Sequence, residues 1–165
     1  MTVAFIGHRR IEYSVKLESE LKAVILNFIV NENADTFLFG SKSEFNSLCS
    51  KVVSELQTEH KQIKKVYVRA EYEYIDKDYT DYLLESYDDT YFPKQVEGAG
   101  RLSYIKRNKE MIDSCDVLIT YFNDSYQPCT AKHKTNSGTK IAVEYAKSKH
   151  TRIVNLLALS DSKQI

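Results

Sequence analysis

Short apolar runs alternate with amphipathic segments along most of the chain. An apolar run that ends at a turn residue is typical of a strand buried on both faces, whereas apolar positions spaced three or four residues apart are typical of a helix with one buried face. The strands predicted in this way cover residues 3–6, 36–39, 66–68, 116–122 and 152–156. The predicted helices cover residues 15–30, 102–114 and 138–149, and a further helix opens at the capping-box pattern of Ser41-Lys42-Ser43-Glu44.

The alternation of strands and helices predicts the fold class. Strands separated by helices pair in parallel, because each connection crosses back over the sheet, and the helices then cover both faces. We therefore expect an α/β, Rossmann-like doubly wound domain with a mostly parallel five-stranded sheet flanked by helices. A chain of 165 residues is long enough for one such domain and too short for two, so residues 1–165 are assigned to a single domain.

The stretch at about 70–100 departs from this alternation. It is rich in Asp and Glu and, counted with Tyr67, it carries seven of the chain's 12 tyrosines: Tyr67, Tyr72, Tyr74, Tyr79, Tyr82, Tyr87 and Tyr91. Loops of this length in compact domains are usually functional or disordered, and so many large rings argue against disorder. We expect a partly helical excursion whose rings either cover a sheet edge or stack on the base of a ligand.

Composition and charge narrow the classes of function. Lys and Arg number 23, as do Asp and Glu, so the bulk charge gives no reason to expect duplex nucleic acid as a partner. No apolar run is long enough to cross a membrane and the first residues lack a signal-peptide layout, so we expect a cytoplasmic protein without a membrane partner. The spacing of the three cysteines, Cys49, Cys115 and Cys129, fits neither a disulfide framework nor a zinc site. We expect no metal or other cofactor. Cys49 and Cys115 are interpreted as small buried hydrophobes.

Three turns that follow predicted strands carry candidate binding chemistry. In doubly wound folds ligands bind beyond the carboxyl ends of the strands, where such turns meet. The first turn offers a glycine for close approach and an arginine fork for a phosphate, and the third leads into a helix whose first amides and dipole attract anions. The candidate ligand-binding residues are Gly7, His8 and Arg9 in the first turn, Gly40 and Ser41 in the second, and Ser137, Gly138 and Thr139 in the third.

Each turn also has a plainer interpretation. An arginine after a strand is often simply exposed, and Gly40 with Ser41 can form a helix cap and nothing more. His8 is either a general acid or base or, since no partner is evident, a hydrogen-bonding turn residue. The third turn follows the basic stretch 132–134 and is the best local signal, but it has neither P-loop spacing nor a dinucleotide fingerprint. Standard nucleotide triphosphatase and nicotinamide dehydrogenase activities are therefore disfavoured.

The predicted helix 102–114 is a fourth candidate element. Its period places Asn108 on the apolar face with Tyr104 and Met111, and Arg107 at the edge of that face. A polar amide among apolar side chains needs partners, which are either neighbouring backbone groups or a ligand that reaches in from the strand ends. Arg107 and Asn108 therefore join the candidate ligand-binding residues.

Several of these segments together resemble a known family. They are GHR at 7–9, FGS at 39–41, YIKRNKEMIDSCDVLITYFND at 104–124 and NSGTKIAVEYAK at 136–147. This combination resembles the YpsA-like branch of the SLOG superfamily, which also contains the Lonely Guy phosphoribohydrolases, DprA and sensor domains of bacterial antiviral systems. The resemblance covers about residues 1–157 without the tyrosine-rich excursion. It implies a Rossmann-like fold, often homodimeric, that binds a nucleotide or nucleotide-derived ligand through the loops after the first and second strands and the Gly-Thr loop.

The chain departs from the hydrolases that it resembles. Lonely Guy enzymes have a PGGxGTxxE loop with a catalytic Glu three residues after the Thr, whereas here Glu144 comes five residues after Thr139. These five residues turn a helix by about 500°, so Glu144 faces away from the loop. Arg107 matches the helix arginine of the family, but the resemblance places no carboxylate beside it. Binding is therefore favoured over catalysis.

Three functions stay open at this point. The first is a protein that senses or sequesters a nucleotide-derived signal, such as an ADP-ribose derivative or a cyclic nucleotide; a phage-encoded sponge that removes an antiviral signal is one form of it. The second is an N-glycosidic phosphoribohydrolase of nucleoside monophosphates that combines Arg107 with an acid from the excursion, for instance Glu71, Glu73 or Glu97. The third is an adaptor or nucleic-acid-processing module, which the balanced charge disfavours.

Overall fold

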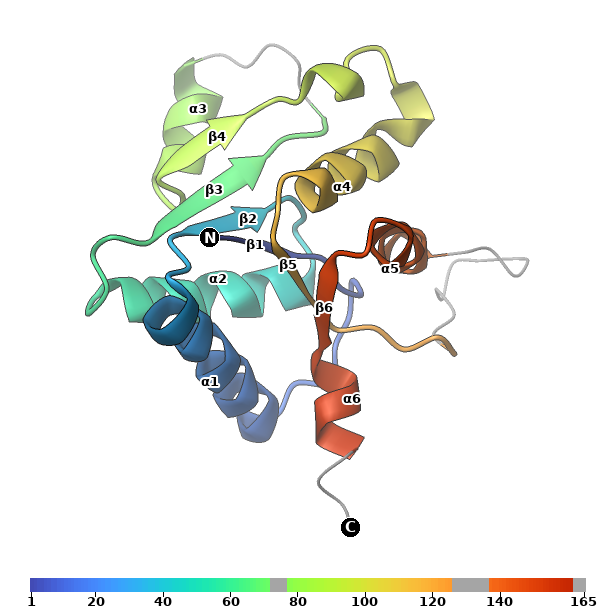
Figure 1. The fold of residues 1–165 in the computed structure, drawn as a ribbon. Helices are drawn as coiled ribbons and strands as arrows, with labels where there is room; N and C mark the ends of the chain where they lie inside the picture. Colours follow the sequence, from blue (N-terminus) through green and yellow to red (C-terminus); the bar gives the residue numbers. More distant parts are fainter. Residues whose placement is uncertain (72–76, 126–136, 162–165) are drawn as a thin grey trace.

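The core of the protein is a six-stranded sheet in which every neighbouring pair of strands is parallel. The computed structural model describes residues 1–71, 77–125 and 137–161 (Figure 1). The strands are β1 (Thr2–Phe5), β2 (Thr36–Phe39), β3 (Lys64–Val68), β4 (Asp89–Tyr91), β5 (Val117–Thr120) and β6 (Arg152–Asn155), in the spatial order β4-β3-β2-β1-β5-β6. The predicted doubly wound α/β fold is confirmed, with one strand more than expected.

Helices cover both faces of this sheet. They are α1 (Val15–Glu32), α2 (Glu44–Gln57), α3 (Lys77–Leu84), α4 (Ser103–Asp113), α5 (Gly138–Ser148) and α6 (Leu156–Asp161), with the short 3-10 helices η1 (Lys94–Val96) and η2 (Gly100–Leu102). Helices α1 and α2 lie on one face, and α4 and α5 lie on the other (Figure 1). Within the described ranges, no helix is both long and apolar enough to cross a bilayer.

The alternation of side chains along each strand builds a core on either face. On β1, Val3 and Phe5 pack with α1 and α2, whereas Ala4 packs with α4 and α5. On β5, Leu118 joins the second core and Ile119 the first. Burial on both faces explains why these strands are continuous apolar runs in the sequence.

The tyrosine-rich excursion contributes the strand that the sequence analysis missed. Strand β4 pairs with β3 at the edge of the sheet, and α3 precedes it. The ring of Tyr87 lies 5.5 Å from that of Phe39 and 5.0 Å from that of Tyr67, so at least these rings cover the edge of the sheet. Of the predicted tyrosine cluster, Tyr72 and Tyr74 lie outside the described residues.

The cysteines that the structure describes are compatible with the predicted role as hydrophobes. Cys49 is fully buried on α2, and burial raises the pKa of its thiol well above the usual value. Cys115 is half-buried, and burial raises its pKa to about 12. It follows the C-cap residue of α4, Ser114. Cys129 lies outside the described residues.

The strand order creates a switch point beside β1. The chain leaves β1 toward β2 on one side, while β5 pairs with β1 on the other side. The connections that follow β1 and β5 therefore diverge, and a crevice opens at the carboxyl ends of the central strands. The residues that line this crevice define the candidate site.

Candidate functional site

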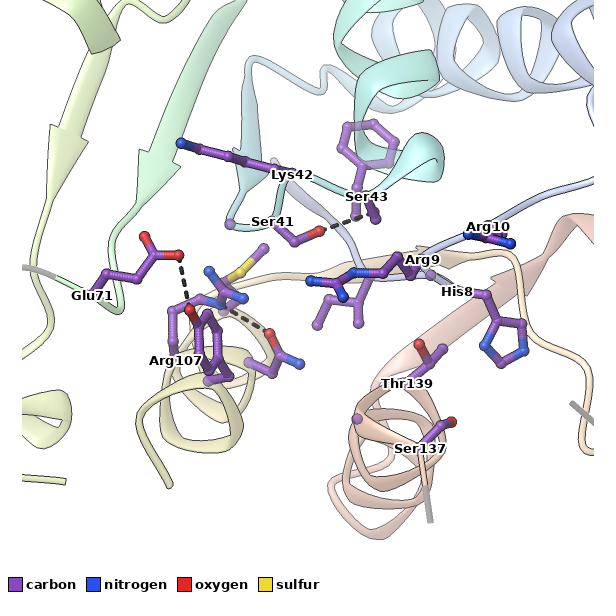
Figure 2. Close-up of a pocket in the computed structure, with 18 residues that line it drawn as sticks. His8, Arg9, Arg10, Ser41, Lys42, Ser43, Glu71, Arg107, Ser137 and Thr139 are labelled. Carbon is purple, nitrogen blue, oxygen red and sulfur yellow. Dashed lines mark hydrogen bonds between the residues drawn. The ribbon is translucent and has the colours of Figure 1, made fainter. Parts of the chain in front are cut away.

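A cleft of about 520 Å³ lies at the carboxyl ends of β1 and β2, bounded by α4 and by the start of α5 (Figure 2). Eighteen of the described residues line it. They include every candidate ligand-binding residue from the sequence analysis: Gly7, His8, Arg9, Gly40, Ser41, Arg107, Asn108, Ser137, Gly138 and Thr139. Turns that are far apart in the chain meet here because the parallel strands all end at the same edge of the sheet.

The turn after β1 is fixed by packing and by one histidine. A Cβ atom on Gly7 would lie 2.6 Å from Cγ of Phe45, so glycine is required here by the close approach of α2. The ring of His8 is buried, and its Nε2 accepts a hydrogen bond from the Asn123 amide at 2.9 Å. His8 is therefore a hydrogen-bonding turn residue, which ties the end of β1 to the end of β5 across the switch point.

The position of His8 also sets its charge state. Burial lowers the pKa of the His8 imidazole below its usual 6.5, against the opposing effect of the Asn123 backbone. The neutral ring can accept from the Asn123 amide, whereas an imidazolium carries a proton on both nitrogens and cannot. Arg9, the next residue, is exposed and extends across the middle of the cleft (Figure 2).

The turn after β2 is held by a side chain of α2. Asn46 Oδ1 accepts from the amides of Gly40 and Ser41 at 3.2 and 3.1 Å, and its Nδ2 donates to the carbonyl of Phe5 at 3.2 Å. The Gly40 and Ser41 amides are thus engaged by the protein rather than turned toward a ligand. Backbone contact from this turn, one of the two interpretations offered by the sequence, is therefore disfavoured for these two amides.

The start of α2 differs from the predicted capping box. The N-cap is Ser43, whose hydroxyl accepts from the Asn46 amide, and not Ser41. The hydroxyls of Ser41 and Ser43 lie 2.9 Å apart. The Glu44 amide, at the first helical position, donates to the Arg9 carbonyl at 2.9 Å. The shift follows from Asn46, which folds the Gly40–Ser41 segment into a turn of its own before the helix begins.

Helix α4 buries Arg107 more deeply than Asn108, whereas the sequence analysis placed Asn108 on the buried face and Arg107 at its edge. Arg107 is the buried residue, with 3% of its surface exposed, and Asn108 is half-buried. Arg107 Nε donates to Asn108 Oδ1 at 2.9 Å and its Nη1 donates to the Val68 carbonyl at 3.3 Å. The prediction failed because this helix packs against a strand end and a glycine, so the space beneath it accommodates a long polar side chain.

That space depends on Gly40. A Cβ atom at this position would lie 2.6 Å from Nη1 and 2.8 Å from Cδ of Arg107. The Arg107 guanidinium also lies near the face of the Tyr104 ring, 5.7 Å from its centroid. Glycine at position 40 therefore lets the arginine lie flat against the backbone at the floor of the cleft.

Arg107 is a buried cation that forms no ion pair among the described residues, although the charge of Glu71 acts on it from a distance. Desolvation lowers the pKa of its guanidinium, although arginine stays protonated at any physiological pH. Among the described residues no ion pair engages it, and its hydrogen-bond partners are a neutral carbonyl and a neutral amide. A buried charge in such surroundings is costly, and an anion in the cleft would offset that cost.

The N-terminus of α5 closes the far side of the cleft. The Ser137 hydroxyl caps the helix by accepting from the Lys140 amide at 3.1 Å, and the Ile141 amide bonds to the Ser137 carbonyl at 3.0 Å. In the part of the chain that is described, no hydrogen bond engages the amides of Gly138 or Thr139. Since the first amides of a helix point out of its end, these two are donors available to an anion. The basic stretch 132–134 lies outside the described residues.

Other residues in the cleft were not assigned to the site from the sequence. They are Phe5, Ile6, Arg10, Lys42, Ser43, Glu71, Tyr104 and Met111. Glu71, offered only as one of three acids for the hydrolase alternative, accepts a hydrogen bond from the Tyr104 hydroxyl at 2.9 Å. Of the other two acids, Glu97 does not line the cleft and Glu73 lies outside the described residues. Glu144 is exposed and lies away from the cleft, as its position on the helix predicted.

The charges around the cleft favour an organic anion. Among the described residues, four cationic side chains line it, namely Arg9, Arg10, Lys42 and Arg107, against the one carboxylate of Glu71. The described residues contain no cluster of three His, Cys, Asp or Glu side chains suited to a metal ion. Arginine forks and helix amides bind phosphate through directed hydrogen bonds. A volume of about 520 Å³ lies in the range of sites for small molecules.

Comparison with known proteins gives no independent indication of the ligand. No protein-family model matches the chain, and no curated protein matches its sequence.

Proposed function

We propose that the protein binds a nucleotide or nucleotide-derived signal in this cleft, as a sensor or a sequestering protein. The observation that carries the proposal is the buried Arg107 guanidinium, which lacks a carboxylate partner among the described residues and lines the same cleft as the open amides of α5. Two independent groups that prefer an anion thus border one cavity. The resemblance to the YpsA-like branch of the SLOG superfamily adds nucleotides as the class of anion.

The geometry supports binding more strongly than hydrolysis. The α5 end of the cleft offers a hydroxyl cap, free amides and a dipole, but no carboxylate among its described residues. An N-glycosidic hydrolase needs an acid or base beside the bond that it breaks. Signals such as ADP-ribose derivatives and cyclic nucleotides combine phosphate groups with sugars and bases. Such ligands match a cleft with several cations.

Calorimetric titration tests this proposal directly. We expect AMP, ADP-ribose or a cyclic adenylate to bind with at least about micromolar affinity, equally well with and without EDTA, because no metal cluster is found among the described residues. Arg9→Ala should weaken that binding at least about tenfold through the loss of a charge-assisted hydrogen bond. The matched control is Arg101→Ala, since Arg101 is also exposed but lies outside the cleft. Absence of heat with all of these ligands would remove the support for the proposal.

One observation keeps the phosphoribohydrolase as a second candidate. Glu71 and Arg107 line the same cleft, and Tyr104 contacts both of them. If this pair were catalytic, nucleoside monophosphates would release free base, and Arg107→Ala and Glu71→Ala would each abolish the release. We expect no release from the wild type, because the hydrolases that the chain resembles carry their catalytic Glu in the Gly-Thr loop, whereas Glu144 lies away from the cleft. Chromatography of the reaction mixture separates base from nucleotide.

A further inference from the structure

Glu71 makes the two ends of the cleft chemically different. It follows β3, lies at the lip of the cleft and is the one carboxylate among the described residues that line it. Its Oε1 accepts from the Tyr104 hydroxyl at 2.9 Å, and no ion pair within the described ranges neutralises it. In Figure 2, Glu71 lies beyond Arg107 at one end, and Ser137 and Thr139 lie at the other end. One end of the cleft thus offers the α5 amides, and at the other end the Glu71 carboxylate lies near the charge of Arg107 (Figure 2).

This difference between the two ends restricts which part of a ligand can lie beside Glu71. An ionised carboxylate only accepts hydrogen bonds, and it repels a phosphate. The phosphate must then lie toward Arg9, Arg107 and the α5 amides, whereas a neutral group that carries donors lies against Glu71. Tyr104 holds the carboxylate through one oxygen, and within the described ranges no hydrogen bond engages the other oxygen.

A second hollow continues from this point. It measures about 390 Å³ and shares Glu71 and Tyr104 with the cleft. Apolar side chains form much of its remaining wall, among them Phe92, Val96 and Ala99. Such a hollow is suited to a flat, weakly polar ring. From α5 outward, the protein therefore offers an anion site, a hydrogen-bond acceptor and an open hollow of mixed polarity that includes the ring of Phe92.

We propose that Glu71 accepts hydrogen bonds from the neighbouring 2′- and 3′-hydroxyls of a ribose and thereby selects ribonucleotides over deoxyribonucleotides. The assignment rests on the proposed function, since it orders a nucleotide within the same cleft. A ribonucleoside 5′-phosphate presents its groups in the order that the protein offers: phosphate, donor-bearing sugar, base. A site built to accept from a hydroxyl discriminates strongly against an analogue that lacks the group.

The test compares matched ribo and deoxyribo ligands. The affinities of AMP, 2′-deoxy-AMP, GMP, 2′-deoxy-GMP and ribose 5-phosphate are measured by calorimetry for the wild type, Glu71→Ala and Glu97→Ala. Glu97 is the control because it is an exposed acid of the same excursion that lines neither hollow. We expect each ribonucleotide to bind at least about tenfold more tightly than its 2′-deoxy counterpart, with the ratio falling to about one in Glu71→Ala and unchanged in Glu97→Ala.

The outcomes separate this inference from the function on which it rests. Equal affinities for ribo and deoxyribo ligands in the wild type, or a ratio that persists in Glu71→Ala, would overturn the ribose assignment while the proposed function stands. A preference between AMP and GMP that disappears with Glu71 would also overturn it, since Glu71 would then contact the base. Failure of every one of these ligands, ribose 5-phosphate included, to bind would overturn both.

Discussion

Replacement of Arg107 by methionine should separate stability from binding. The free protein loses two hydrogen bonds that Arg107 donates. One of them engages the buried Val68 carbonyl, and the loss of this donor destabilises the fold by about 1–3 kcal/mol. It also loses the desolvation penalty of a buried cation that no ion pair among the described residues offsets, a penalty of several kcal/mol. The two effects oppose each other. We therefore expect Arg107→Met to unfold with a free energy no more than about 1 kcal/mol below that of the wild type, or above it.

Nucleotide binding, unlike stability, should be clearly weakened in Arg107→Met. The loss of a charge-assisted hydrogen bond costs about 2 kcal/mol, or roughly thirtyfold in Kd. A nucleotide at about one hundred times its wild-type Kd stabilises the wild type by about 2.7 kcal/mol. The same concentration should stabilise Arg107→Met by less than about 1 kcal/mol.

Urea unfolding with and without nucleotide measures both quantities. The ligand is the one that binds most tightly in the calorimetric series, and the control is Arg101→Met, which replaces an exposed arginine outside the cleft. A variant destabilised by more than about 3 kcal/mol that still gains the full wild-type stabilisation from nucleotide would refute the reasoning. Arg107 would then be a structural residue whose charge the fold itself requires.

Three other substitutions probe the walls of the cleft. Gly40→Ala should displace Arg107, and we expect it to weaken nucleotide binding at least about tenfold and to destabilise the fold by about 1–3 kcal/mol. Calorimetry measures the first effect and urea unfolding the second. Unchanged affinity would contradict the tight contact between position 40 and Arg107. Gly138→Val should weaken binding to a similar degree with little change in Tm, because a Cβ atom there meets no other atom within 4 Å; a large drop in Tm would argue against this. The buried His8 has a lowered pKa, so its contribution to stability is complete above pH 6.5 and is lost as the pH falls through its folded-state pKa. Urea unfolding between about pH 7.5 and about pH 5 should therefore show a steeper loss for the wild type than for His8→Gln, and parallel curves would contradict the assignment.

The sequence analysis identified the central strands because they are buried on both faces. Such strands are continuous apolar runs, and each ended where the pattern changed. Strand β4 was missed for the opposite reason, since Asp89-Thr90-Tyr91 is a short edge strand without an apolar run. Its pairing with β3 depends on tertiary contacts rather than on its own composition.

The candidate site was predictable to the extent that topology determines it. Turns that follow parallel strands must meet at one edge, so Gly7, Gly40 and Gly138 came together without any knowledge of side-chain packing. The orientation of Arg107 was not predictable from helical period, because it depends on the absence of a side chain on Gly40. The same holds for the turn at Gly40, whose amides are engaged by Asn46 from the following helix.

The connections of Asn46 have a kinetic consequence. Its side chain joins the turn after β2 to the carbonyl of Phe5 at the end of β1, and the Glu44 amide holds the Arg9 carbonyl. Two of the loops that form the cleft are thus ordered before a ligand arrives, so little of the cost of ordering backbone falls on binding. Association with this part of the cleft should follow a single exponential whose rate rises linearly with ligand concentration, without the plateau of a slow rearrangement. An Asn46→Ala variant would loosen both loops at once and shift the process toward binding limited by loop closure.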